Sequence, residues 1–95
     1  QFLDSIPTDN IATAVINGHA RIISELRDIN YPKFNEIPVE AVCEAVKRGH
    51  TSVLAELLKC KYDKWNEIPV EVVSEAITKG HSGVIEQLVN AGYNK

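Results

Sequence analysis

The sequence contains no methionine, one tryptophan and two cysteines. Two cysteines cannot form a disulfide framework, so we expect Cys43 and Cys60 to be free thiols in a reducing compartment, cytoplasmic or nuclear, with a regulatory disulfide as the alternative. No apolar run approaches the roughly 20 residues that a membrane-spanning helix needs, and the short, acidic segment after Gln1 is not a signal peptide. Because the chain begins at Gln1 and lacks methionine, we expect it to be a piece of a longer protein.

Positive charge is also scarce. Lys and Arg total 10 against 13 Asp and Glu, which gives a net charge of −3 and a pI of about 5.5. Binding to nucleic acid or to an anionic membrane needs clustered basic residues, so we expect neither as a partner. A DNA-reading array of helical hairpins stays open as an alternative, but it would need a basic groove. The five glycines form no phosphate-binding loop.

The chain contains an internal repeat of 31 residues. The hexapeptide NEIPVE occurs at residues 35–40 and again at residues 66–71. A shift of 31 residues also aligns the dipeptides Gly18-His19, Gly49-His50 and Gly80-His81. The length, with 44% hydrophobic and 24% charged residues, fits one soluble globular domain. We therefore predict a single repeat domain over residues 1–95, with repeats at about 6–36, 37–67 and 68–95.

Each repeat has the pattern of two helices. In the middle repeat the first helix is predicted over Pro38–Lys47, with Asn35 as its N-cap and Gly49 as the left-handed residue that ends it. The second is predicted over about Ser52–Lys59, because its apolar residues recur at the spacing of one helical face. The predicted N-cap residues of the second helices are Ala20, Thr51 and Ser82. Since one hairpin cannot bury both sides of its apolar stripe, we predict an all-α solenoid of three stacked helix-turn-helix repeats with short loops.

The segments EAVKRGHTSVLAELL and EAITKGHSGVIEQLV resemble the core of an ankyrin repeat. The matching residues are Ala45, Gly49, His50, Val53, Leu57 and Leu58 in one copy, and Ala76, Gly80, His81, Val84, Leu88 and Val89 in the next. The repeats differ from the family in length, 31 residues against about 33. IPVE replaces the usual Thr-Pro-Leu-His opening, so we expect a plain short loop where the family projects a β-hairpin finger.

Residues with catalytic or metal-binding chemistry are present, but their placement favours structural roles. His19, His50 and His81 occupy one repeat position, and equivalent residues of neighbouring hairpins are about 8–10 Å apart, too far to share an ion. We expect each histidine to stabilise its turn through hydrogen bonds. The carboxylates Glu40, Glu44, Glu71 and Glu75 fall at helix starts and exposed faces. We therefore expect no enzyme activity, no cofactor and no metal.

Two sets of residues are candidates for contacting a partner. The resemblance implies that partners bind the exposed face of the first helices, where residues vary between repeats: Thr13, Ile16, Asn17, Glu44, Lys47, Arg48, Glu75, Thr78 and Lys79. The secondary set is aromatic and recurs with lysines in the loops: Tyr31, Phe34, Tyr62, Trp65 and Tyr93, with Lys33, Lys64 and Lys95. Because the aromatic set repeats so regularly, we favour the interpretation that its rings cover the base of the repeats.

The function that these patterns predict is that of a noncatalytic protein–protein interaction module. It would bind a protein partner through the exposed face of its first helices. The alternative is a substrate- or host-target-recruiting repeat domain of a larger multidomain enzyme, such as a secreted bacterial effector.

Overall fold

The computed structural model describes residues 5–94, so residues 1–4 and Lys95 of the repeated lysine series lie outside the described part. Over the described residues the chain is helical and contains no β-strand. The α-helices are α2 (Thr8–Ile16), α3 (Ala20–Asp28), α4 (Val39–Arg48), α5 (Thr51–Lys59), α6 (Val70–Thr78) and α7 (Ser82–Asn90). Two short 3-10 helices, η1 (Phe34–Glu36) and η2 (Trp65–Glu67), precede α4 and α6. The all-α prediction is confirmed.

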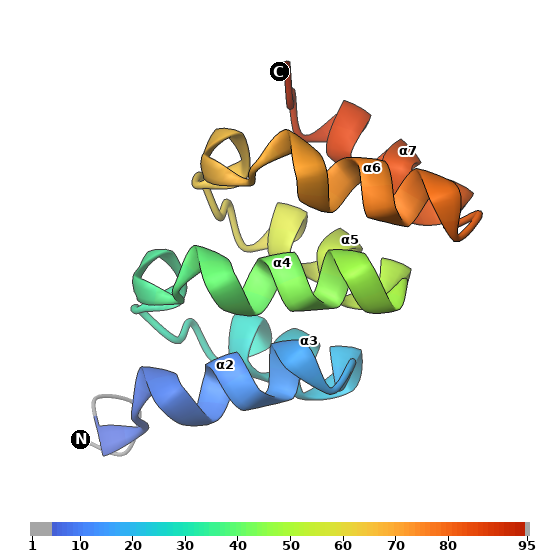
Figure 1. Cartoon of the computed structure of the whole chain (residues 1–95). Coiled ribbons are helices and arrows are strands. Elements are labelled where there is room, and N and C mark those ends of the chain that lie inside the picture. The colour runs from blue at the N-terminus through green and yellow to red at the C-terminus, as the bar shows by residue number, and fades with distance from the viewer. Residues whose placement is uncertain (1–4, 95) are drawn as a thin grey trace.

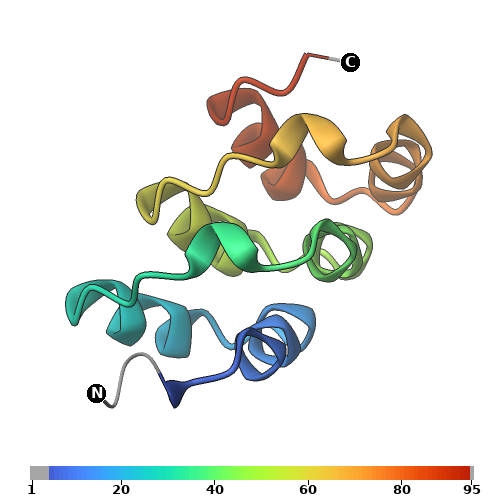
Figure 2. The same cartoon turned by 90° about the vertical axis from the view of Figure 1, so that its left-hand side faces the viewer.

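The helices pair into three hairpins that lie in sequence order along one direction (Figure 1). We call α2–α3 the first hairpin, α4–α5 the middle hairpin and α6–α7 the last hairpin. Helix α4 packs between α2 and α6, and α5 packs between α3 and α7, so the helices form two rows. The quarter-turned view in Figure 2 shows the row of α2, α4 and α6 end-on. The molecule is elongated, with extents of 43 × 21 × 19 Å.

The first helix of the middle hairpin begins one residue later than its predicted start. Pro38 is the N-cap of α4, with an extended backbone, and it has no amide hydrogen that could be left unpaired. Asn35 is not the N-cap, so that prediction was wrong. It lies in η1, and its side-chain oxygen accepts a hydrogen bond of 3.1 Å from the backbone amide of Asp63. Asn66 accepts the equivalent bond from Asn94.

The turn inside the middle hairpin has the left-handed glycine that the sequence predicts. Gly49 ends α4 with φ of 76°, which is favourable only for glycine. The second helices, however, have histidines as N-caps, because His19, His50 and His81 precede their first residues. Ala20, Thr51 and Ser82 are therefore the first helical residues, and their predicted capping role was wrong.

The connections between hairpins are more ordered than the plain loops that we expected. Each contains a 3-10 helix whose aromatic residue, Phe34 or Trp65, is buried. Ile37 and Ile68 follow these short helices and are fully buried between neighbouring hairpins. The NEIPVE segments thus form the joints between hairpins, and their apolar residues belong to one continuous core.

Candidate protein-binding surface

The variable residues of the first helices lie on α2, α4 and α6 and at their C-terminal ends. We call these nine residues the first-helix surface: Thr13, Ile16, Asn17, Glu44, Lys47, Arg48, Glu75, Thr78 and Lys79. Each of them is exposed or half-buried, and none is in the core. Because α4 packs against both α2 and α6, the surface extends over three adjacent helices.

Hydrogen bonds between hairpins tie this surface together. Arg48 Nη1 donates to the carbonyl oxygen of Ile16, the last residue of α2, at 3.2 Å. Lys79 Nζ, one repeat later, approaches the carbonyl oxygen of Lys47 at 3.4 Å. A cation at the C-terminal end of a helix is favoured, because the last carbonyls have no partner within the helix and carry partial negative charge. Arg48 and Lys79 therefore link each hairpin to the preceding one as well as facing solvent.

Ion pairs within single helices further order the surface. Glu44 lies 3.7 Å from Lys47 Nζ and 3.8 Å from Arg48 Nε. The pair of Glu75 and Lys79 is tighter, at 2.9 Å, and the hydrogen bond from Lys79 lowers the pKa of the Glu75 carboxyl. Exposed pairs of this kind contribute only about 0.3–0.5 kcal/mol each, so a partner can displace them at low cost.

The uncharged members of the surface differ in what they offer to a partner. The hydroxyls of Thr13 and Thr78 donate to carbonyls one turn back in their own helices, both at 3.0 Å. Ile16 is half-buried beside Asn17 at the end of α2. The surface therefore changes from uncharged on the first hairpin to charged on the middle and last hairpins.

The secondary, aromatic set does not form an exposed strip. Tyr31, Phe34, Tyr62 and Trp65 are all buried, and only Tyr93 is partly accessible. The rings meet edge to face within each hairpin, with centroids 5.3 Å apart for Tyr31 and Phe34 and 5.5 Å apart for Tyr62 and Trp65. Since buried rings offer no contact area to a partner, the structural interpretation of this set holds.

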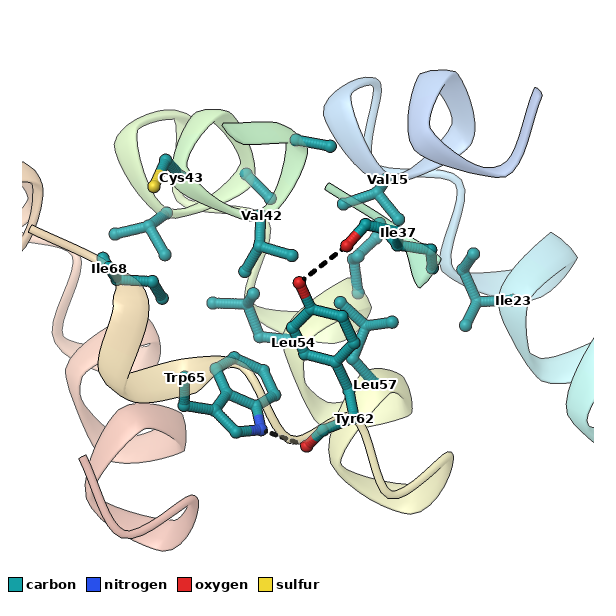
Figure 3. Close-up of a cluster of buried hydrophobic side chains, with 14 of the residues drawn as sticks. Val15, Ile23, Ile37, Val42, Cys43, Leu54, Leu57, Tyr62, Trp65 and Ile68 are labelled. Carbon is teal, nitrogen blue, oxygen red and sulfur yellow. Dashed lines mark hydrogen bonds between the residues drawn. The ribbon is translucent and has the colours of Figure 1, made fainter. Parts of the chain in front are cut away.

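Each tyrosine hydroxyl of this set bonds to the hairpin joint that lies 25 residues earlier. Tyr62 donates to the carbonyl oxygen of Ile37 at 3.0 Å, as Figure 3 shows. Tyr31 and Tyr93 make the equivalent bonds to Ile6 and Ile68, at 3.1 and 2.9 Å. Burial raises the pKa of the Tyr62 hydroxyl, so it remains a neutral donor.

The histidines act by packing and not through hydrogen bonds. No histidine side chain makes a hydrogen bond within residues 5–94, which corrects our expectation. Instead, His50 lies against Gly18 and His81 lies against Gly49, each contacting the turn of the preceding hairpin. A Cβ on either glycine would lie 2.8 Å from a ring atom, closer than van der Waals contact allows. The repeated Gly-His pair is therefore a contact between hairpins.

The remaining reactive groups do not assemble into a catalytic or metal centre. Cys43 is buried and Cys60 half-buried, both are free thiols, and burial raises both pKa values, that of Cys60 to about 11. Glu40 and Glu71 are exposed at helix starts. Within residues 5–94, no three His, Cys, Asp or Glu side chains lie close enough together to hold a metal ion. None of the described helices is long and apolar enough to cross a membrane.

A link that the sequence analysis missed joins the second helices of the first two hairpins. Arg27 Nη2 on α3 lies 3.2 Å from Glu56 Oε1 on α5, and the Glu56 side chain is largely shielded from solvent. Arg27 occupies the repeat position of Leu58 and Val89, so its departure from the apolar pattern was the available signal. Comparison with protein-family models, curated proteins and solved structures found no match to this chain.

Proposed function

We propose that this chain is a divergent ankyrin-like solenoid of three stacked repeats that serves as a noncatalytic protein-interaction module. In this proposal it works in the reducing environment of the cytoplasm or nucleus and binds one protein partner through the first-helix surface. The free, largely shielded cysteines agree with such a compartment.

One observation carries the proposal. The residues that repeat between hairpins serve internal contacts: tyrosine hydroxyls on isoleucine carbonyls, histidine rings on glycines, and asparagine side chains on backbone amides. The residues that do not repeat gather on one exposed surface across α2, α4 and α6. Architecture needs the same residues in each repeat, whereas specific recognition of a partner needs different ones.

The chemistry of the surface indicates the kind of partner. Two carboxylates, Glu44 and Glu75, alternate with Lys47, Arg48 and Lys79, so no single charge dominates. A partner with acidic groups facing Lys47 and Arg48, and an apolar or uncharged region facing Ile16, would match this distribution. Replacing the weak internal pairs by pairs to the partner would favour orientation and specificity more than affinity.

The experiment compares two charge-reversal variants in partner capture. The test variant combines Lys47→Glu and Arg48→Glu, and the control combines Lys59→Glu and Lys61→Glu, which are exposed at the end of α5, away from the first-helix surface. Both variants change the net charge by the same amount. Partners of the wild-type protein are captured from cell extract by crosslinking and identified by mass spectrometry, and purified partners are then titrated against all three proteins.

We expect the test variant to lose at least about tenfold in affinity for the purified partner, because two cations at the centre of the surface become anions. The control should bind like the wild type. Circular dichroism and thermal melting check that both variants are folded. Equal loss in both variants, or undiminished binding by the test variant, would contradict the assignment of the first-helix surface.

A further inference from the structure

The exposed large aliphatic side chains of the described chain lie at the two ends of the hairpin series. They are Ile22, Ile29, Val70, Ile77 and Val89. Ile22 and Ile29 belong to the first hairpin or its C-terminal end, and the other three belong to the last hairpin. The middle hairpin contributes none. The exposed apolar surface is therefore a property of the ends and not of the repeat itself.

The apolar face of the last hairpin corresponds to a face that is buried in the other two. Ile77 is 61% exposed, whereas its equivalents Val15 and Val46 are fully buried beneath the next hairpin. Val70, Val73 and Ile77 follow each other at helical spacing along α6, and Ile85 and Val89 do the same along α7. A hollow of about 320 Å³ opens here, lined by Ile77, Gly80, His81, Ser82 and Ile85. We call this the C-terminal face.

The first hairpin presents the counterpart. Ile22 is 48% exposed, whereas its equivalents Val53 and Val84 are buried against the preceding hairpin. Ile29 is likewise exposed where Cys60 and Ala91 are half-buried. We call the surface formed by His19, Ile22 and Ile29 the N-terminal face. It carries the kind of residues that cover the C-terminal side of a hairpin inside the molecule.

The glycine–histidine contact gives this match a specific geometry. His50 packs on Gly18 and His81 packs on Gly49, but no atom lies within 4 Å of a Cβ placed on Gly80. His19, at the same repeat position, is exposed. One vacant glycine on the C-terminal face and one exposed histidine on the N-terminal face would complete the internal pattern if two copies met end to end.

We propose that the C-terminal face binds the N-terminal face of a second copy of this chain, head to tail, with the relation that neighbouring hairpins have inside the molecule. His19 of the second copy then packs on Gly80, and Ile22 packs over Ile77 and Ile85. Such a joint is heterologous, so each added copy leaves the same free faces and the assembly extends instead of closing. The proposal concerns the end faces and does not depend on the first-helix surface.

The joint between copies is weaker than the internal ones. The α2 side of the N-terminal face carries Asn10, where the middle and last hairpins have the buried Ala41 and Val72. Asn17 also replaces the cation that Arg48 and Lys79 extend to the preceding helix end. The apolar contact is thus concentrated on α3, and we expect reversible, concentration-dependent association and not a permanent oligomer.

The test measures mass against concentration by sedimentation equilibrium, from about 10 μM to about 1 mM, the range in which weak interfaces associate. The variants are Ile77→Glu, which places a charge in the C-terminal face, and Ile22→Glu, which places one in the N-terminal face. Asn90→Glu is the matched control, because it adds the same charge to the last hairpin at a repeat position that is exposed in all three hairpins. Since all three sites are exposed, each variant should fold, and thermal melting checks this.

We expect the wild type and Asn90→Glu to rise above the 10.5 kDa monomer mass with concentration, and each face variant alone to remain a monomer. The decisive sample is an equal mixture of Ile22→Glu and Ile77→Glu. One partner retains the C-terminal face and the other the N-terminal face, so the mixture should approach twice the monomer mass and stop there. A wild type that stays monomeric, a mixture that stays monomeric, or self-association of Ile22→Glu alone would each overturn the head-to-tail joint.

Discussion

Removing a single oxygen atom from Tyr62 tests whether the joints between hairpins determine stability. The Tyr62 side chain is 3% exposed, and its hydroxyl is the described donor to the carbonyl of Ile37, whose own residue is fully buried. In Tyr62→Phe the ring keeps its edge-to-face contact with Trp65, so the change isolates the hydrogen bond. The Ile37 carbonyl is left buried without a donor, and such an orphaned group costs about 1–3 kcal/mol.

We therefore expect the free energy of unfolding to fall by about 2 kcal/mol and the melting temperature by about 8–16 °C for a domain of this size. Urea unfolding followed by circular dichroism measures the first quantity, and a thermal melt measures the second. Tyr93→Phe is the matched control, because it removes the same bond at a partly exposed position. Water can replace the lost donor there, so its loss should be below about 1 kcal/mol. Equal losses in the two variants, or a melting temperature of Tyr62→Phe within about 2 °C of the wild type, would refute the reasoning.

Two further predictions concern the turns and the thiols. Gly49→Ala and Gly80→Ala both place a Cβ at φ near +80°, but only Gly49 faces a histidine ring at 2.8 Å; Gly80→Ala should cost about 1–2 kcal/mol and Gly49→Ala clearly more, measured by urea unfolding, and equal costs would mean that His81 yields freely. Cys60, with its pKa raised from 9.0 to about 11, should react with iodoacetamide at pH 8 roughly a hundredfold more slowly than an ordinary thiol and should recover in urea, as followed by mass spectrometry; a fast reaction in the folded protein would contradict this shielding.

The helices and their boundaries were predictable because their signals are local. The apolar spacing along α4, the proline before it and the glycine after it all lie within one segment, and each states where the helix begins or ends. The exposure of the first-helix surface followed in the same way, from residues that fall off the apolar stripe. The errors were also local in origin. Asn35 has the chemistry of an N-cap, but the three-dimensional arrangement places its side chain against the amide of Asp63.

The sequence by itself determined the 31-residue period, the two helices of each repeat and the burial of the aromatic set, because these depend on the composition and spacing of neighbouring residues. Only the tertiary structure decided how each histidine and tyrosine acts, since their partners are a glycine 32 residues earlier and an isoleucine carbonyl 25 residues earlier. It also showed that the face buried between hairpins lies open on α6 and α7. Contacts over such distances depend on how the hairpins pack, and no pattern within a single repeat records that packing.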